Sequence, residues 1–191
     1  EEIYDLQRFE TISEIYLINH NESNPIHSDS LSKKSKAIFL KALKSFSNQI
    51  PNQSDINIFD QKIRVIIENE ISKMFKKADE QQSISGLSIP PYIDSILEAK
   101  SKRFALLTFT SGTIKAKEKK SNIKQSENIS IGTISNNDNA YQIHSIIAVI
   151  IVDSKENNIA FYKKSLLENE EPLDLSILKK QIDEIFSGYF W

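Results

Sequence analysis

The chain has 191 residues, enough for one domain with its own apolar core, and its 39% hydrophobic and 26% charged residues are typical of a globular protein rather than a disordered one. A net charge of -2 excludes nucleic-acid binding driven by overall charge, and the absence of cysteine excludes thiol catalysis, disulfides and thiolate metal sites. No apolar run approaches the roughly 20 residues that cross a bilayer. We expect a single domain over residues 1–191.

The first part of the chain predicts a strand and then a helix. Residues 14–18 form an apolar stretch typical of a strand, and the polar residues 19–30 predict a loop. A helix is expected to begin near Asp29 or Ser30, which are good N-caps, and to end before Pro51. Its apolar face would consist of Leu31, Ile38, Phe39, Ala42, Leu43 and Phe46.

Two further helices are predicted next. A second helix follows Asp60, because apolar residues recur at spacings of three and four over residues 63–78. A polar linker around Gly86 separates it from a short helix that Pro90 and Pro91 open.

The second half of the chain predicts strands. Residues 104–110 are apolar and β-branched, and this strand is expected to end at Gly112. Residues 115–128 would form a loop before a short strand over 129–134. The almost continuous apolar run 143–152 is typical of a central strand that is covered on both faces.

A hairpin and a helix are expected to complete the fold. Residues 153–158 predict a turn, after which residues 159–162 pair back. A last helix would start at Pro172 and Asp174 and stop at Gly188. The order of elements predicts an α/β (α+β) domain with a mixed, largely antiparallel sheet of about five strands and helices packed on it.

The glycines exclude the common phosphate-binding loops. Gly86, Gly112, Gly132 and Gly188 are far apart in the sequence, so neither a dinucleotide fingerprint nor a P-loop is present, and no Gly-x-Ser-x-Gly elbow occurs. We expect no cofactor.

The three histidines leave two interpretations open. His144 could be a buried general base beside Ser145, or a strand-end histidine that is hydrogen-bonded within the sheet. His20 and His27, near Asp29, could hold a metal loosely or lie in a solvated loop. The second interpretation is favoured in each case, so no catalytic or metal-binding residue is assigned.

The carboxylates do not predict an acid/base pair. Glu68 and Glu70 are two residues apart on a helix and do not face each other. The acidic group of Glu168, Glu170 and Glu171 precedes the last helix, where it favours the positive end of the helix.

Two segments are candidates for an interaction surface. The basic segment 115–124 could face an anionic surface or form a solvated loop. The aromatic residues 189–191 could be part of the core or an exposed end that a partner covers. The candidate residues are Lys115, Lys117, Lys119, Lys120, Tyr189, Phe190 and Trp191.

Residues 88–115, 144–165 and 172–186 resemble a family of uncharacterised exported lipoproteins of Bacteroides-type bacteria. The fold of this family is akin to the amino-terminal domain of TolB and to the curli-secretion lipoprotein. The resemblance covers roughly the last half of the chain, as a pattern of strand, glycine turn, strand hairpin and helix. It implies a periplasmic or outer-membrane-associated protein, and the lipidated cysteine would lie upstream of Glu1.

These observations predict a non-enzymatic interaction module of the cell envelope. Its partner would be another envelope protein or a second copy of itself, with no nucleic acid involved. Peripheral contact with the membrane surface would follow from the upstream lipid anchor. Two alternatives stay open: a hydrolase with a loop-borne site that uses His144 or His20, and a protein that binds a small ligand or a glycan.

Overall fold

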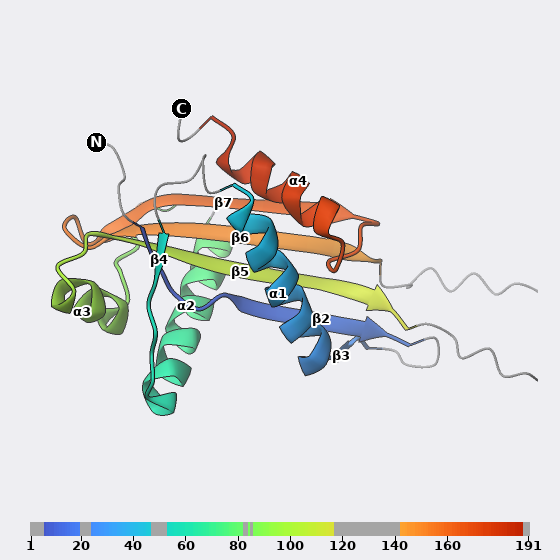
Figure 1. Cartoon of the computed structure of the whole chain (residues 1–191), viewed down its shortest axis with the longest axis horizontal. Coiled ribbons are helices and arrows are strands. Elements are labelled where there is room, and N and C mark those ends of the chain that lie inside the picture. Colours follow the sequence, from blue (N-terminus) through green and yellow to red (C-terminus); the bar gives the residue numbers. More distant parts are fainter. Residues whose placement is uncertain are drawn as a thin grey trace, which may run out of the picture.

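The computed structural model describes residues 6–19, 24–46, 53–81, 84, 86–116 and 142–188. Within these residues, four helices pack on a mixed sheet of seven strands, which confirms the α/β (α+β) class (Figure 1). The strands are β1 (Leu6–Arg8), β2 (Ile12–Ile18), β3 (Ile26–His27), β4 (Gln53–Asp55), β5 (Phe104–Lys115), β6 (His144–Asp153) and β7 (Asn158–Glu168). The helices are α1 (Asp29–Lys44), α2 (Gln61–Gln81), α3 (Pro91–Ala99) and α4 (Leu175–Phe186).

The sheet differs from the prediction in the number and direction of its strands. The short strands β1, β3 and β4 were not predicted, and β3 falls in the expected loop 19–30, whereas α1 begins at Asp29 as expected. Three strand pairs are parallel, β1–β4, β1–β5 and β2–β5, and three are antiparallel, so the expectation of a largely antiparallel sheet was wrong. Two-residue and three-residue strands are too short to show the alternation that marks a strand in a sequence.

Strands β1 and β2 together form one long strand that is broken in the middle. Both run parallel to β5, with β1 pairing at Ala105 and Leu106 and β2 pairing from Phe109 onward. They share one edge of β5, because β6 occupies the other edge along nearly its whole length. Strand β4 pairs with the outer side of β1, and β3 pairs with the outer side of β2. Residues 9–11 form the break between the two halves.

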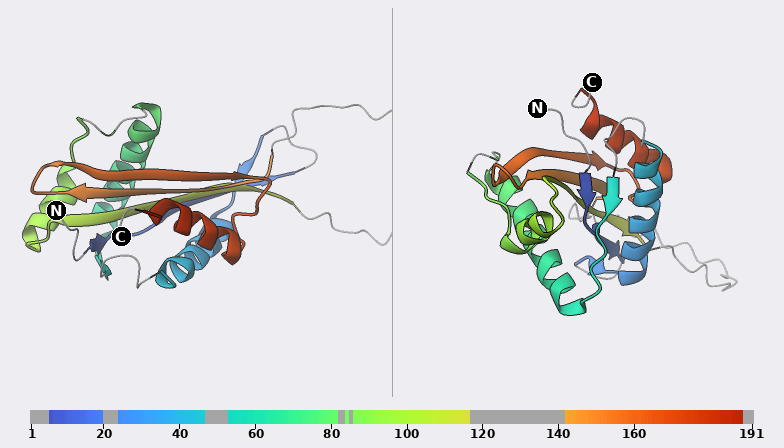
Figure 2. Two further views of the ribbon diagram at one scale, coloured as in Figure 1. Left: turned by 90° about the horizontal axis from the view of Figure 1, so that it is seen from above. Right: turned by 60° about the vertical axis from the view of Figure 1, so that its left-hand side comes forward.

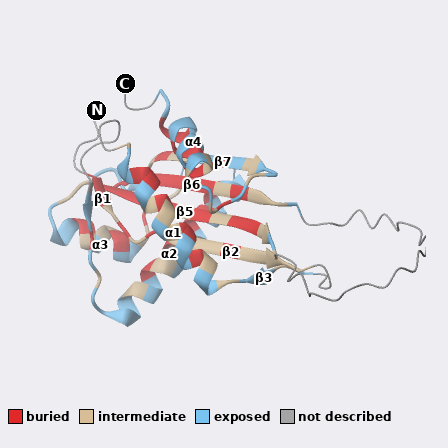
Figure 3. Cartoon of the chain, turned by 45° about the vertical axis from the view of Figure 1, so that its right-hand side comes forward, coloured by how far each residue is buried: buried red, intermediate tan, exposed pale blue. Residues whose placement is uncertain are grey.

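The predicted interior strand is confirmed as β6. It pairs with β5 on one side and with β7 on the other, and its residues from Ile147 to Val152 are all buried. Alternate side chains of a strand point to opposite faces. Ala148, Ile150 and Val152 therefore enter one core, while Ile147, Val149 and Ile151 enter the other. Figure 3 shows the burial concentrated along β5 and β6.

Helices cover both faces of the sheet. Helices α1 and α4 pack on one face through residues such as Phe39, Leu43 and Ile182. Helices α2 and α3 contribute residues such as Ile71 and Leu97 to the core on the other face. Figure 2 shows α1 and α4 together on one side of the sheet and α2 on the other.

Strand β5 continues past Gly112, where it was expected to end. Gly112 pairs with both Ile15 and Ser145 in the middle of the sheet. A Cβ atom at this position would lie 2.4 Å from the carbonyl oxygen of His144 and 2.6 Å from the Cβ of Pro172. The glycine therefore serves close packing of the chain and does not terminate the strand.

The last hairpin and the last helix follow the prediction, with one extension. Strand β7 runs on to Glu168 instead of ending near Tyr162. Helix α4 begins after Asp174, whose side chain accepts a hydrogen bond from the backbone N–H of Ser176 at 2.7 Å. The expected strand over 129–134 lies outside the described residues.

Candidate functional site

A cavity of about 320 Å³ lies where the long strand is broken. We call it the break cavity. Its walls come from the end of β1, the break, α1, the segment that follows β4 and the first turn of α2. It forms here because β4 ends at Asp55, and β3 pairs only with Tyr16 and Leu17. In the described part of the chain, no strand covers the sheet edge between these two short strands.

One wall of the break cavity carries an ion pair between two strands. Arg8 and Asp55 are register partners at the ends of the parallel strands β1 and β4, so their side chains lie side by side. The Nε of Arg8 donates to Oδ1 of Asp55 at 2.7 Å, and Nη2 lies 2.5 Å from the same oxygen. The Asp55 side chain is 58% exposed, so water screens this pair.

Glu10, in the break itself, joins helices from the two faces of the sheet. Its Oε1 accepts a hydrogen bond from Nζ of Lys36 on α1, and its Oε2 lies 3.5 Å from Nε of Arg64 on α2. The Nη2 of Arg64 donates to the carbonyl oxygen of Ile58 at 2.9 Å. The Nε of Arg64 is buried and makes no hydrogen bond, so the contact of Arg64 with Glu10 is looser than that of Lys36.

The charge of Glu10 also affects a neighbouring carboxyl group on α2. The pKa of Glu68 is raised from its ordinary value, first by burial and then by the negative charge of Glu10, while Lys36 and Arg64 oppose the shift. The pKa of Glu70 is raised by burial as well, and a hydrogen bond from the backbone of Tyr92 opposes that shift. Glu68 and Glu70 thus respond to different neighbours, as expected of residues two apart on a helix.

The rim of the break cavity is apolar and exposed. Phe59, in the segment between β4 and α2, is 93% exposed. Ile63 and Ile66, on the first turns of α2, are each 37% exposed but do not line the cavity. Figure 3 shows that the beginning of α2, at its lower end, is partly or fully exposed.

The charged groups of the break cavity are paired with one another. Its three cationic side chains, Arg8, Lys36 and Arg64, lie against its two carboxylates, Glu10 and Asp55. A general base or nucleophile needs a reacting partner in hydrogen-bond reach and a group that activates it. Here the carboxylates neutralise neighbouring cations instead. Among the described residues, no group of three histidines and carboxylates could hold a metal ion.

The described histidines make local contacts. The Nδ1 of His144 lies 3.1 Å from Oγ1 of Thr113 and 3.2 Å from the carbonyl oxygen of Gln142, as predicted for a strand-end histidine that is hydrogen-bonded within the sheet. The hydroxyl of Ser145 donates to Oε1 of Gln181 on α4 at 2.7 Å and has no histidine partner.

His27, the other described histidine, lies in the short strand β3. Its Nδ1 is 3.3 Å from a carboxylate oxygen of Asp29, and its ring meets the ring of Tyr16 edge to face. His20 lies outside the described residues.

The predicted interaction surfaces fall almost wholly outside the described residues. Lys115 is the last residue of β5 and is exposed. The remaining candidates, which are not described, are Lys117, Lys119, Lys120, Tyr189, Phe190 and Trp191. No helix in the described part of the chain is long and apolar enough to cross a membrane.

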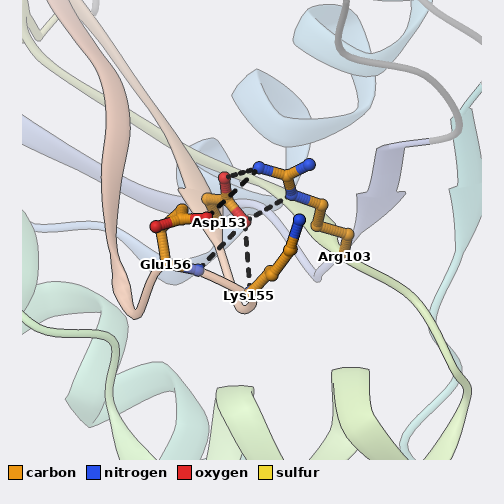
Figure 4. A network of polar contacts seen from close by, with 4 residues as sticks. All are labelled: Arg103, Asp153, Lys155 and Glu156. Atoms are coloured by element: carbon orange, nitrogen blue, oxygen red, sulfur yellow. Dashed lines mark hydrogen bonds and ion pairs between the residues drawn. The ribbon is translucent and has the colours of Figure 1, made fainter. Parts of the chain in front are cut away.

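A second ionic cluster lies beside the first residue of β5, at the turn between β6 and β7, and we call it the hairpin lock (Figure 4). Arg103 donates two hydrogen bonds to Asp153 in a bidentate pair, from Nε to Oδ1 at 2.8 Å and from Nη2 to Oδ2 at 2.7 Å. The backbone N–H groups of Lys155 and Glu156 also donate to Oδ1 of Asp153. This cluster fixes the turn between β6 and β7 and is structural.

The sequence reasoning missed the break cavity. Two signals were available: Arg8 and Arg64 are two of only three arginines in the chain, and Phe59 is a large apolar residue just before a helix. Neither signal places these residues together, because Arg8 is about 50 residues from the other two in the sequence.

Comparison with known proteins identifies no family for this chain: no family model and no curated protein matches it. Among solved structures, a PelC dodecamer from Paraburkholderia phytofirmans aligns over 98% of this chain and 90% of its own, with 9% identity and a TM-score of 0.38. A point variant of the same dodecamer aligns over 96% and 87%, also with 9% identity and a TM-score of 0.37. At these scores the likeness carries no conclusion about function.

Proposed function

We propose that this protein is a non-enzymatic interaction module of the cell envelope and that the break cavity is its binding site. The envelope location and the lipid anchor rest on the resemblance to exported lipoproteins. In this proposal the anchor holds the domain at the membrane surface, where the basic segment that starts at Lys115 could contact anionic headgroups.

The observation that supports a binding role is the combination of a polar cavity with an exposed apolar rim. Scattered apolar residues on a surface are ordinary, but exposed apolar residues beside a cavity mark a place where a ligand or partner gains contact area. Phe59, which lines the cavity and is 93% exposed, is the residue that provides this contact area. The paired charged side chains of the break cavity could bind a ligand without taking part in a reaction.

Fluorine NMR of the folded protein tests this proposal directly. One sample carries a fluorinated phenylalanine at Phe59, and a matched sample carries a fluorinated tyrosine at Tyr92, which is exposed on α3 and does not line the break cavity. Each is titrated with envelope extract of the source organism, separated into protein, lipid and polysaccharide fractions. We expect one fraction to shift or broaden the signal at position 59 and leave position 92 unchanged.

Two results would count against the proposal. In the first, no fraction changes the signal at position 59. In the second, both signals change equally, which would indicate nonspecific adsorption instead of binding at the cavity.

A further inference from the structure

We propose that the break cavity binds a short stretch of an uncharged glycan, with one sugar ring packed against Phe59. This inference rests on the proposed function, because it names the class of ligand for the same site. It is supported by the charge balance of the cavity, by its apolar groups and by its position at the sheet edge.

The charges of the break cavity disfavour a strongly charged ligand. Arg8 and Lys36 are already paired with Asp55 and Glu10, and Arg64 also lies against Glu10. An anionic ligand would have to compete with these carboxylates and would then lie beside them. A cationic ligand would meet three positive side chains.

Hydroxyl groups fit this arrangement without breaking it. A hydroxyl both donates and accepts hydrogen bonds, and an ionised carboxylate offers about four lone-pair sites to donors. Glu10 and Asp55 are partly exposed, at 37% and 58%, so their remaining lone pairs can accept from a ligand while the ion pairs persist. The partly exposed guanidinium group of Arg64 can donate to a hydroxyl oxygen in the same way.

The apolar groups of the break cavity are complementary to the C–H faces of a sugar ring. A pyranose ring has faces formed by C–H groups and edges that carry hydroxyls, so its face packs on an aromatic ring while its edges make hydrogen bonds. Phe59 offers such a ring at the rim, and Phe9, Leu40 and Ile58 add apolar surface to the lining. A ligand with polar edges and an apolar face is therefore complementary to this site.

The size and position of the break cavity favour part of a longer chain. Its volume of about 320 Å³ is at the low end of the range for ligand pockets, about 300–1,000 Å³. It lies at the edge of the sheet between β3 and β4, and its rim is exposed at Phe59. A glycan could therefore place a short stretch in the cavity while the rest of the chain stays in solvent.

An immobilised array of neutral and anionic glycans, followed by calorimetry with the best neutral glycan in soluble form, tests the inference. We expect the folded wild-type protein to bind neutral glycans with an affinity that changes little between about 0.01 M and 0.15 M ionic strength. Phe59→Ala should weaken binding about tenfold, equivalent to about 1.4 kcal/mol. Phe59→Trp should retain it, and Tyr92→Ala should leave it unchanged as the matched control. Circular dichroism would verify that every variant is folded.

Three results would overturn the inference. They are the absence of binding to any neutral glycan, binding that Phe59→Ala leaves intact, and binding confined to anionic glycans with a steep dependence on salt. A fluorine signal at position 59 that responds only to the protein fraction would also overturn it. In that case the proposed function would stand, since the cavity would bind a different class of partner.

Discussion

The hairpin lock and the break cavity are two ionic clusters at different places on the sheet, and they are built in opposite ways. In the hairpin lock, Asp153 has only 7% of its side chain exposed, and both of its oxygens accept hydrogen bonds. In the break cavity, the side chain of Asp55 is 58% exposed, and Arg64 has a buried N–H without a hydrogen bond. The hydrogen-bonding groups of Asp153 in the hairpin lock are satisfied within that cluster, whereas the break cavity keeps an exposed carboxylate and an N–H without a hydrogen bond.

This difference indicates that arginine–aspartate pairs in the same sheet can differ in how much they contribute to stability. A bidentate pair that also accepts backbone N–H groups fixes a turn in one geometry, and nothing in it is left to bind a ligand. An exposed pair contributes little to stability, since water screens it and two long side chains lose freedom. The Arg8–Asp55 pair can therefore belong to the proposed binding site while it contributes little to the stability of the fold.

The largest expected effect is the loss of the hairpin lock. Asp153→Ala should lower the free energy of unfolding by about 3 kcal/mol, because it removes the bidentate pair with Arg103 and the carboxylate that accepts from two backbone N–H groups. Urea unfolding followed by circular dichroism measures this. The control is Glu156→Ala, whose carboxylate is exposed and 4.0 Å from Arg103, and a small loss is expected there. Equal losses for the two variants would contradict the structural role of Asp153.

A smaller effect is expected at the break cavity. Asp55→Ala should lower the free energy of unfolding by less than about 1 kcal/mol, as for other exposed ion pairs. A double-mutant cycle with Arg8→Ala isolates the pair, and its coupling energy should be smaller than that of the Arg103–Asp153 cycle. If the coupling energy of Arg8 and Asp55 were as large as that of Arg103 and Asp153, both pairs would stabilise the fold equally, and the contrast between the two clusters would be wrong.

The smallest expected effect is a pH-dependent increase in the free energy of unfolding when Glu68 is replaced by glutamine. Because folding raises the pKa of Glu68 above its ordinary value of 4.5, the folded state favours the protonated form. The resulting stabilisation is present at low pH and is lost as the pH rises through the raised pKa. Glu68→Gln does not ionise, so it should be more stable than wild type at neutral pH by less than about 1 kcal/mol.

Unfolding measured across acid and neutral pH checks this prediction. The two stability curves should converge below pH 4.5, where Glu68 is protonated in both states. A variant that is less stable than wild type at neutral pH would show that the carboxylate of Glu68 makes a favourable contact.

The long elements could be predicted from the sequence because their patterns are strong. The run that became β6 is apolar on both faces, and the stripe from Ile63 to Ala78 repeats at helical spacing. The short strands could not be predicted, because β4 is the polar tripeptide Gln53–Asp55 and gains its structure only by pairing with β1. Gly112 was misread because the sequence cannot show that Pro172 packs against it.

The break cavity was beyond sequence reasoning for a related reason. Arg8 and Asp55 are 47 residues apart in the chain, and Glu10 and Lys36 are 26 apart. Their meeting depends on the break at residues 9–11 and on the place of β4, and neither feature has a local pattern. Composition and motifs could only indicate that no common catalytic or phosphate-binding site was present.

The packing of α1 against α4 has a consequence for the protein while it folds. The core on this face joins Leu6 and Phe39, near the start of the chain, with Ile182 and Phe186, near its end. Before α4 has formed, the apolar side of α1 has no helix to pack against on that face. A chain in which α4 has not yet formed therefore exposes this surface, and such a species is prone to aggregation.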